Sequence, residues 1–369
     1  MARRRAPLFA GAIVLVLLAG ALLLLALPGD EQEPPPPPSA GPRAGIWLSA
    51  AEIRRLPTEG PAWEALLREA DRKPRRADVS DQDSLHDVRT LAAALVHART
   101  GAEVYRERAA EGIDDAIGTE RGGRTLALGR NLVGYVVAAD LIDLRAYDAD
   151  ADERFREWLG EVRDERLDDG RTLRETHAER PNNWGAMAGA SRAAIAVYLG
   201  DRDDLEQAAK VFRGYLGDRS AYAGFEYGDD LSWQADEDEP VGVNPAGATR
   251  DGIELGGALP DDMRRGCPLR APPCHTGYAW EALQGLLVQA EILARQGYEV
   301  WDWSDRALLR AVEFVYGLDE RYGGWAPEGD DGWQVWLANR AYGTDFETEQ
   351  PTRPGKNMGF TDWTHQRLS

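Results

Sequence analysis

Apolar residues recur at helical spacing along most of this chain. Between residues 83 and 101 they fall on one stripe, which is the pattern of a helix packed against a core. The stripe consists of Leu85, Val88, Leu91, Ala92, Leu95 and Val96. Similar segments predict helices over residues 48–56, 61–72, 102–118, 125–144, 152–167, 184–199, 201–218, 277–297 and 302–318. No convincing strand pattern interrupts them, so the sequence predicts an all-α domain.

Several of these helices carry recognisable end signals. Ser49 is suited to cap the helix at 48–56, and Pro61 stands in the first turn of the next one. Gly101 and Gly200 are suited to end the predicted helices that precede them. The segment 125–144 is apolar almost all round, which indicates a helix buried on every side.

Consecutive helices of this length favour antiparallel pairs, and we expect residues 46–369 to form an α/α toroid, an incomplete α/α barrel around a central cleft. A helical solenoid is the alternative, but the chain shows no fixed repeat. The segment 220–277 is long, irregular and rich in Gly, Pro and Asp, which favours a functional loop. The tail from residue 319 is also expected to be irregular. Its tryptophans can stack on sugar rings or complete the core.

The N-terminus has the pattern of a membrane anchor. Residues 1–5 form a basic segment, residues 6–27 are apolar and long enough to span a bilayer, and residues 28–45 form a linker with Pro34–Pro38 at its centre. The basic residues predict a single-pass protein of the cell membrane with its C-terminal domain outside. A cleaved signal peptide, which would give a secreted protein, is the alternative.

Charge and cysteine content narrow the functional classes. With 63 acidic and 43 basic residues the net charge is −20, which argues against a nucleic-acid partner. Cys267 and Cys274 are the two cysteines. Outside the cell they are expected to form a disulfide, although free thiols or a partial metal site remain alternatives. The sequence shows no convincing metal-ligand constellation.

Two stretches carry candidate chemistry. The first, RPNNWGAMAGA from Arg180, places Asn182, Asn183 and Trp184 at the start of a helix. One asparagine suffices for capping, so the second can face a ligand. The second stretch, GGALPDDMRRGCPLRAPPCHTGYAWEAL from Gly256, brings arginines close to a histidine and a tyrosine. These are Arg264, Arg265, Arg270, His275 and Tyr278.

Together the two stretches resemble the alginate lyase family of α/α-toroid polysaccharide lyases. That family has an Asn-Asn-His motif at the start of an inner helix and a later segment D-G-x-L-P-x-E-L-x-R-G-x-R-A-L-H-Y-H-N-Y-A-L. Here GALP, Arg265-Gly266, Arg270-Ala271 and the H-x-x-Y-A step at 275–279 match that segment, with one extra residue before the tyrosine. The resemblance runs from about residue 83 to 293 and includes GRNLVGYVVAADLI at 129–142.

The resemblance implies cleavage of a uronic-acid polysaccharide by β-elimination, without a metal or organic cofactor. Asn183 and Arg270 would neutralise the substrate carboxylate, and Tyr278 would act as base, acid or both. The departure is Trp184, which replaces the family's histidine and cannot take a proton. His177 or His275 would have to substitute for it. Further candidate substrate contacts are Asn182, Trp184, Arg265 and His86.

Two other functions remain open. The acidic pairs Asp229-Asp230 and Asp261-Asp262 suit a glycoside hydrolase on the same scaffold, which needs two carboxyl groups. The replacement of the histidine by Trp184 suits a glycan-binding protein of the cell envelope that has lost catalysis.

Overall fold

The computed structural model describes residues 45–72, 76–349 and 355–366. The predicted basic segment, the apolar run at 6–27 and the linker, apart from Gly45, lie outside the described residues. Contacts divide the chain into Met1–Pro38 and Ser39–Ser369, and the described residues belong to the second unit. Within that part of the chain, no helix combines the length and the apolar character required to cross a membrane.

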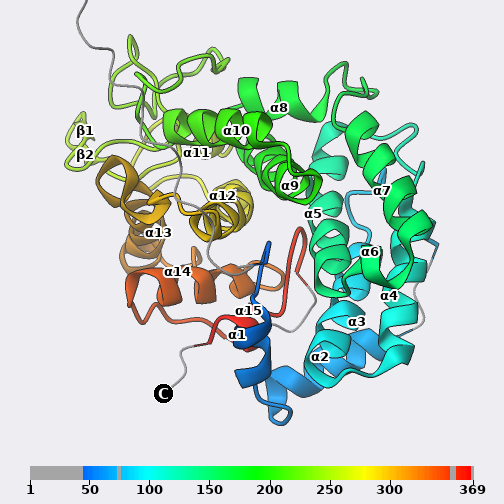
Figure 1. The fold of residues 1–369 in the computed structure, drawn as a ribbon. Coiled ribbons are helices and arrows are strands. Elements are labelled where there is room, and N and C mark those ends of the chain that lie inside the picture. Colours follow the sequence, from blue (N-terminus) through cyan, green and yellow to red (C-terminus); the bar gives the residue numbers. More distant parts are fainter. Residues whose placement is uncertain (1–44, 73–75, 350–354, 367–369) are drawn as a thin grey trace, which may run out of the picture. The chain divides into compact units, whose positions relative to one another are not determined.

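The described residues are mostly helical, as predicted, and four long helices form an inner row (Figure 1). They are α3 (His86–Thr100), α5 (Thr125–Leu141), α9 (Asn183–Leu199) and α12 (Tyr278–Arg295). Each inner helix packs on the next one in this order. The partner helices that flank them are α2 (Pro61–Asp71), α4 (Glu103–Ala116), α6 (Leu144–Tyr147), α7 (Ala149–Val162), α8 (Leu173–Glu179), α10 (Arg202–Tyr215) and α13 (Trp303–Tyr322).

The inner helices approach one another closely because small residues line their contacts. A Cβ on Gly129 of α5 would lie 2.8 Å from the backbone of Ala188, and one on Gly285 of α12 would lie 2.3 Å from that of Ala186. Ser191 of α9 also bonds α5 directly: its hydroxyl donates to the carbonyl of Gly129 at 2.8 Å. These contacts bring the N-terminal halves of α5, α9 and α12 together.

Local capping explains why several helices begin and end as predicted. Ser49 caps α1 (Ala50–Arg55) through a reciprocal bond pair with Glu52. Pro61 is the first residue of α2. Gly101 and Gly200 adopt left-handed φ values of 74° and 71° directly after α3 and α9. Residues that carry a side chain rarely adopt this backbone conformation, which is why glycine ends both helices.

The tail is more ordered than predicted. Instead of an irregular segment it contains the end of α13, the 3-10 helix η2 (Gly332–Gln334), α14 (Val335–Tyr342) and α15 (Thr361–Thr364). Helix α14 packs on α12, and α15 packs on α2, so the tail links the last inner helix back to the first helices. Trp333 and Trp363 are fully buried, and the indole of Trp363 donates to the Pro57 carbonyl at 2.9 Å.

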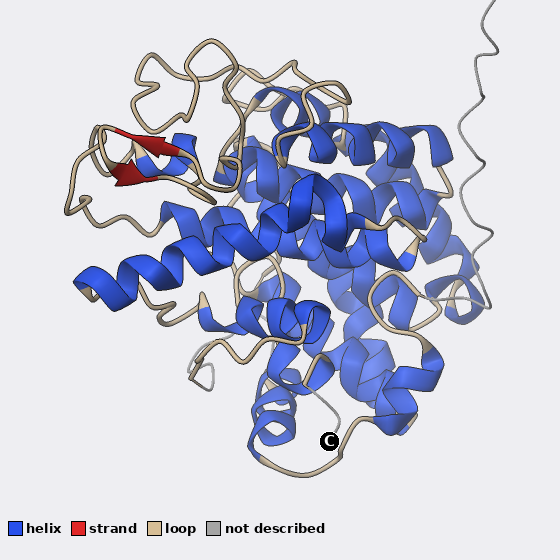
Figure 2. Cartoon of the chain, turned by 90° about the vertical axis from the view of Figure 1, so that its left-hand side faces the viewer, coloured by secondary structure: helices blue, strands red, loops and turns tan. Residues whose placement is uncertain are grey.

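The long segment between α10 and α12 contains only short elements. They are the antiparallel pair β1 (Thr249–Arg250) and β2 (Ile253–Glu254), and α11 (Pro260–Met263). Figure 2 shows the two strands among loops beside one end of the helices. The predicted disulfide between Cys267 and Cys274 is present in this segment, with Cα atoms 5.7 Å apart.

Candidate functional site

The two asparagines at the start of α9 have different roles. Asn182 is the N-cap, because its Oδ1 accepts a hydrogen bond from the backbone N–H of Trp184 at 3.0 Å. Its Nδ2 donates to Asp261 at 2.7 Å. The backbone N–H of Asn183 is taken by Asp262 at 3.0 Å. The side chain of Asn183 is therefore not needed for capping.

Asn183 instead joins a polar network that runs from the interior to the surface. Its amide Nδ2 donates to Oε2 of Glu281 at 2.7 Å, and its Oδ1 accepts from Nη1 of Arg265 at 2.8 Å. The same Glu281 oxygen accepts from Nη2 of Arg130 at 2.8 Å. Asn183 and Arg130 are buried, whereas the Glu281 side chain is 30% exposed and Arg265 is exposed.

Tyr278 meets that network through Arg265. The guanidinium carbon of Arg265 lies 3.3 Å from the centroid of the Tyr278 ring. Tyr278 is the first residue of α12, and its backbone N–H donates to the hydroxyl of Thr276 at 3.2 Å. A cavity of about 460 Å³ opens beside the pair. It is lined by Arg265, Gly266, His275, Thr276, Gly277, Tyr278 and Glu281.

The charges around the cavity favour an anionic ligand. Arg130 and Arg265 contribute two positive charges against the single carboxylate of Glu281. Asp261 is paired with Arg264 at 2.6 Å. Burial, reinforced by Asp261, raises the pKa of Asp262 well above its usual range, which favours its neutral form. The site thus has local positive charge in a chain whose net charge is −20.

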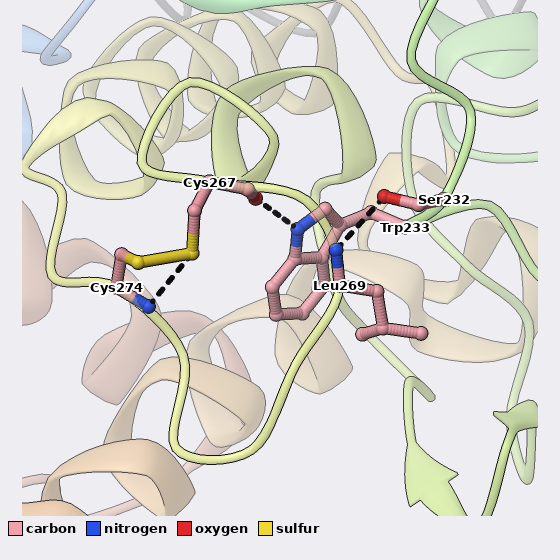
Figure 3. Close-up of a disulfide and its surroundings, with 5 residues drawn as sticks. All are labelled: Ser232, Trp233, Cys267, Leu269 and Cys274. Atoms are coloured by element: carbon pink, nitrogen blue, oxygen red, sulfur yellow. Dashed lines mark hydrogen bonds between the residues drawn. A yellow bond between two sulfur atoms is a disulfide. The ribbon is translucent and has the colours of Figure 1, made fainter.

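The loop that carries Arg265 is held in place at several points. Beyond the disulfide, the indole of Trp233 donates to the Cys267 carbonyl at 2.8 Å, and the backbone N–H of Leu269 donates to the Ser232 hydroxyl at 2.9 Å (Figure 3). Arg265 precedes Cys267 by two residues. The loop contacts therefore limit where its guanidinium can lie.

Arg270 does not join Asn183 and Tyr278. It is exposed, lies between the two cysteines, and lines a different small cavity with Trp233, Phe314 and Arg321. Arg265, and not Arg270, lies beside Asn183 and Tyr278. His275 is exposed at the mouth of the Tyr278 cavity, and its ring lies 5.2 Å from that of Trp325.

Two other histidines are buried away from this cavity. His177 packs beneath α9, with its ring nitrogens 3.3 Å from the Gln289 amide and 3.4 Å from Arg192. Burial lowers its pKa well below the usual range. It therefore cannot replace the missing family histidine as a substrate contact. His86 is 2% exposed and its Nδ1 lies 2.8 Å from the hydroxyl of Tyr135. Burial lowers its pKa as well.

Sequence reasoning missed Glu281, Arg130 and Asp331. Glu281 follows Tyr278 by three residues, the helical spacing that puts both on one face. Arg130 stands out as a charge within an otherwise apolar helix, which is the signal that could have found it. Asp331 accepts a hydrogen bond from Gln284 at 2.5 Å, and burial raises its pKa to about 7. No sequence signal links Asp331 to α12. Among the described residues, no cluster of His, Cys, Asp and Glu is arranged to hold a metal ion.

Comparisons with known proteins find one family model and several solved structures similar to this chain. Residues 53–223 match the family model described as alginate lyase. The apo form of a histidine-to-alanine variant of alginate lyase A1-III is similar in fold, with a TM-score of 0.52 and 13% identity. Alginate lyase A1-III from Sphingomonas species A1 gives a TM-score of 0.52 and 14% identity. Both likenesses cover 88% of this chain and 96% of the other. No curated protein sequence matches this one. Residues 53–223 thus match the alginate lyase family model, and the fold over most of the chain is similar to that of alginate lyase A1-III.

Proposed function

We propose that this protein is a polysaccharide lyase that cleaves a uronic-acid polymer by β-elimination. The observation that carries the proposal is the position of Arg265, which donates to the amide of Asn183 at 2.8 Å and lies 3.3 Å from the ring of Tyr278. The guanidinium and the phenol line one cavity, and the amide lies behind the guanidinium.

The reaction needs each of these groups. A base removes the proton on C5, the electron pair of that C–H bond forms the C4–C5 double bond, and the C4–O bond breaks. The departing oxygen takes up a proton. The C5 proton is poorly acidic until the neighbouring carboxylate is neutralised, so the site requires donors placed on that carboxylate. Arg265 is such a donor, and Asn183, whose amide keeps a second N–H, is another.

Tyr278 is the proposed proton-transfer group. Its ring lies against the Arg265 guanidinium at the cavity, where its hydroxyl can exchange a proton with the substrate. His275, exposed at the same cavity, is the second group able to exchange a proton with the leaving oxygen. Neither role requires Trp184. Tyr278 and His275 can therefore supply the acid and the base although the family's histidine is absent.

A glycan-binding protein without catalysis is the second candidate, and Trp184 is the observation that favours it. The glycoside hydrolase alternative has less support. Asp261 and Asp262 hold the start of α9 and are 3% and 0% exposed, so they have structural roles. Asp230 accepts a bond from the backbone N–H of Ser232 at 2.9 Å in its own loop.

The test is the ultraviolet absorbance of unsaturated uronate products over a panel of uronic-acid polymers. We expect a rise with the wild-type protein and none with Tyr278→Phe, which keeps the ring and the Arg265 contact. Circular dichroism on both proteins controls for folding. Binding of a polymer without any product would select the glycan-binding alternative. New reducing ends without absorbance would select hydrolysis.

We also propose that the domain faces outward from the cell membrane, on the basis of the sequence of residues 1–27. Membrane fractionation, followed by protease treatment of intact cells, tests this proposal. Protein found only in the soluble fraction inside the cell would contradict it.

A further inference from the structure

Trp184 lies between two guanidinium groups. The guanidinium carbon of Arg180 is 4.3 Å from the centroid of its ring, and that of Arg124 is 5.5 Å away. Arg180 is the residue after α8, and Arg124 is the residue before α5. Each guanidinium is attracted to the face of the indole by cation–π interaction. The arrangement also places two like charges beside one indole.

Neither arginine has a carboxylate partner within the described residues. The side chain of Arg180 makes no hydrogen bond or ion pair there, and its Nε is buried without a partner. Arg124 donates to the neutral amide oxygen of Gln82 at 3.1 Å. Arg171, by contrast, pairs with Glu179 at 2.7 Å. The indole of Trp184 therefore lies between two cations that no carboxylate of the described residues pairs.

Asn183 connects this cluster to the Tyr278 cavity. Trp184 directly follows Asn183, whose side chain accepts a hydrogen bond from Arg265 at that cavity. Arg124 directly precedes α5, and α9 packs on both α5 and α12. Neither Arg180 nor Arg124 lines the Tyr278 cavity, so a ligand that reaches them must extend beyond that cavity.

We propose that Arg180, Arg124 and Trp184 form a second subsite, which binds the carboxylate of an adjacent acidic sugar. This inference rests on the proposed uronic-acid substrate and extends it. A guanidinium binds a carboxylate with two parallel hydrogen bonds, and an indole presents a flat apolar face to a sugar ring. The substrate class is then a polymer with acidic groups on neighbouring units. At this position the family's histidine can transfer a proton, whereas Trp184 binds the sugar.

The test is calorimetric binding of uronic-acid trisaccharides in the Tyr278→Phe background, where no cleavage occurs. For the trisaccharide that binds best, Arg180→Gln should weaken binding about tenfold, the loss expected for one charge-assisted contact. Trp184→Ala should weaken it as well. Arg145→Gln is the matched control, because Arg145 is exposed beyond the C-terminal end of α5. Melting curves check that every variant is folded.

A carboxyl-reduced trisaccharide, which is neutral, isolates the charge. Arg180→Gln should bind it as tightly as the parent does. The proposal is overturned if Arg180→Gln behaves like Arg145→Gln, if it loses equal affinity for the neutral ligand, or if no uronic-acid trisaccharide binds. It is also overturned if only a sulfated neutral sugar depends on Arg180. Because binding is measured without turnover, an absence of lyase products would refute the proposed reaction and leave this subsite standing.

Discussion

The guanidinium of Arg265 donates to the amide oxygen of Asn183 at 2.8 Å, although 82 positions separate the two residues in the chain. This bond connects the first turn of α9 to the disulfide loop. It also fixes the orientation of the Asn183 amide, because the oxygen must face Arg265 while the nitrogen faces Glu281. The start of an inner helix is thereby tied to the residue that covers Tyr278.

The two asparagines should respond differently to removal. Asn183→Ala leaves Glu281 and Arg265 each short of a buried partner, so we expect a loss of about 1–3 kcal/mol in the free energy of unfolding and loss of lyase activity. Asn182→Ala removes a helix cap and should cost about 1 kcal/mol while activity persists. Urea unfolding and product absorbance measure both. Equal loss of activity in the two variants would contradict the division of roles.

The pair of Arg130 and Glu281 should show strong coupling. Arg130→Met leaves the carboxylate of Glu281, whose side chain is 30% exposed, without its cation, so we expect a loss of about 1–3 kcal/mol in the free energy of unfolding. Arg130→Met combined with Glu281→Gln should be more stable than Arg130→Met alone, because no uncompensated charge remains. A double-mutant cycle by urea unfolding provides the comparison. Additive effects would show that the two side chains do not interact.

Asp331 should make stability fall as the pH rises. Burial, together with repulsion from Asp330, raises the pKa of Asp331 to about 7 in the folded protein, whereas an unfolded aspartate has a pKa of about 3.9. Between these values the folded state holds a proton that the unfolded state has released, so the contribution of Asp331 to stability declines from about pH 4 to about pH 7. Asp331→Asn keeps the acceptor for Gln284 and should remove this decline. The free energy of unfolding of both proteins, measured over that pH range, tests this prediction. The same pH dependence in the two proteins would contradict it.

Gly285 should tolerate no side chain. A Cβ there would lie 2.3 Å from the backbone of Ala186, and backbone cannot move aside without shifting α9 against α12. We expect Gly285→Ala to destabilise the protein by about 1–3 kcal/mol or more. Gly317→Ala is the matched control: Gly317 lies in α13, and the only atom near its Cβ is the end of the flexible Arg321 side chain at 3.5 Å. Gly317→Ala should leave the free energy of unfolding unchanged or raise it by up to about 1 kcal/mol, since alanine favours helices. Equal loss in both variants would refute the close approach.

The sequence by itself determined most of the inner helices, several of their ends and the disulfide. Ser49, Pro61, Gly101 and Gly200 act on the turn in which they stand, and Cys267 has one possible partner seven positions away. Such signals are local, so they can be read along the chain. The resemblance added Asn183 and Tyr278 as members of one site, but it assigned Arg270 to the position that Arg265 occupies.

Only the tertiary structure decided which side chains meet. The contact of Asn183 with Arg265, the pairing of Arg130 with Glu281 and the burial of Asp331 join residues from different helices. The helices of the tail likewise depend on packing against α12 and α2. The spacing of these residues in the sequence does not indicate which of them will be in contact, because the contacts depend on how the helices pack. Burial then sets the charge and hydrogen bonding of each group.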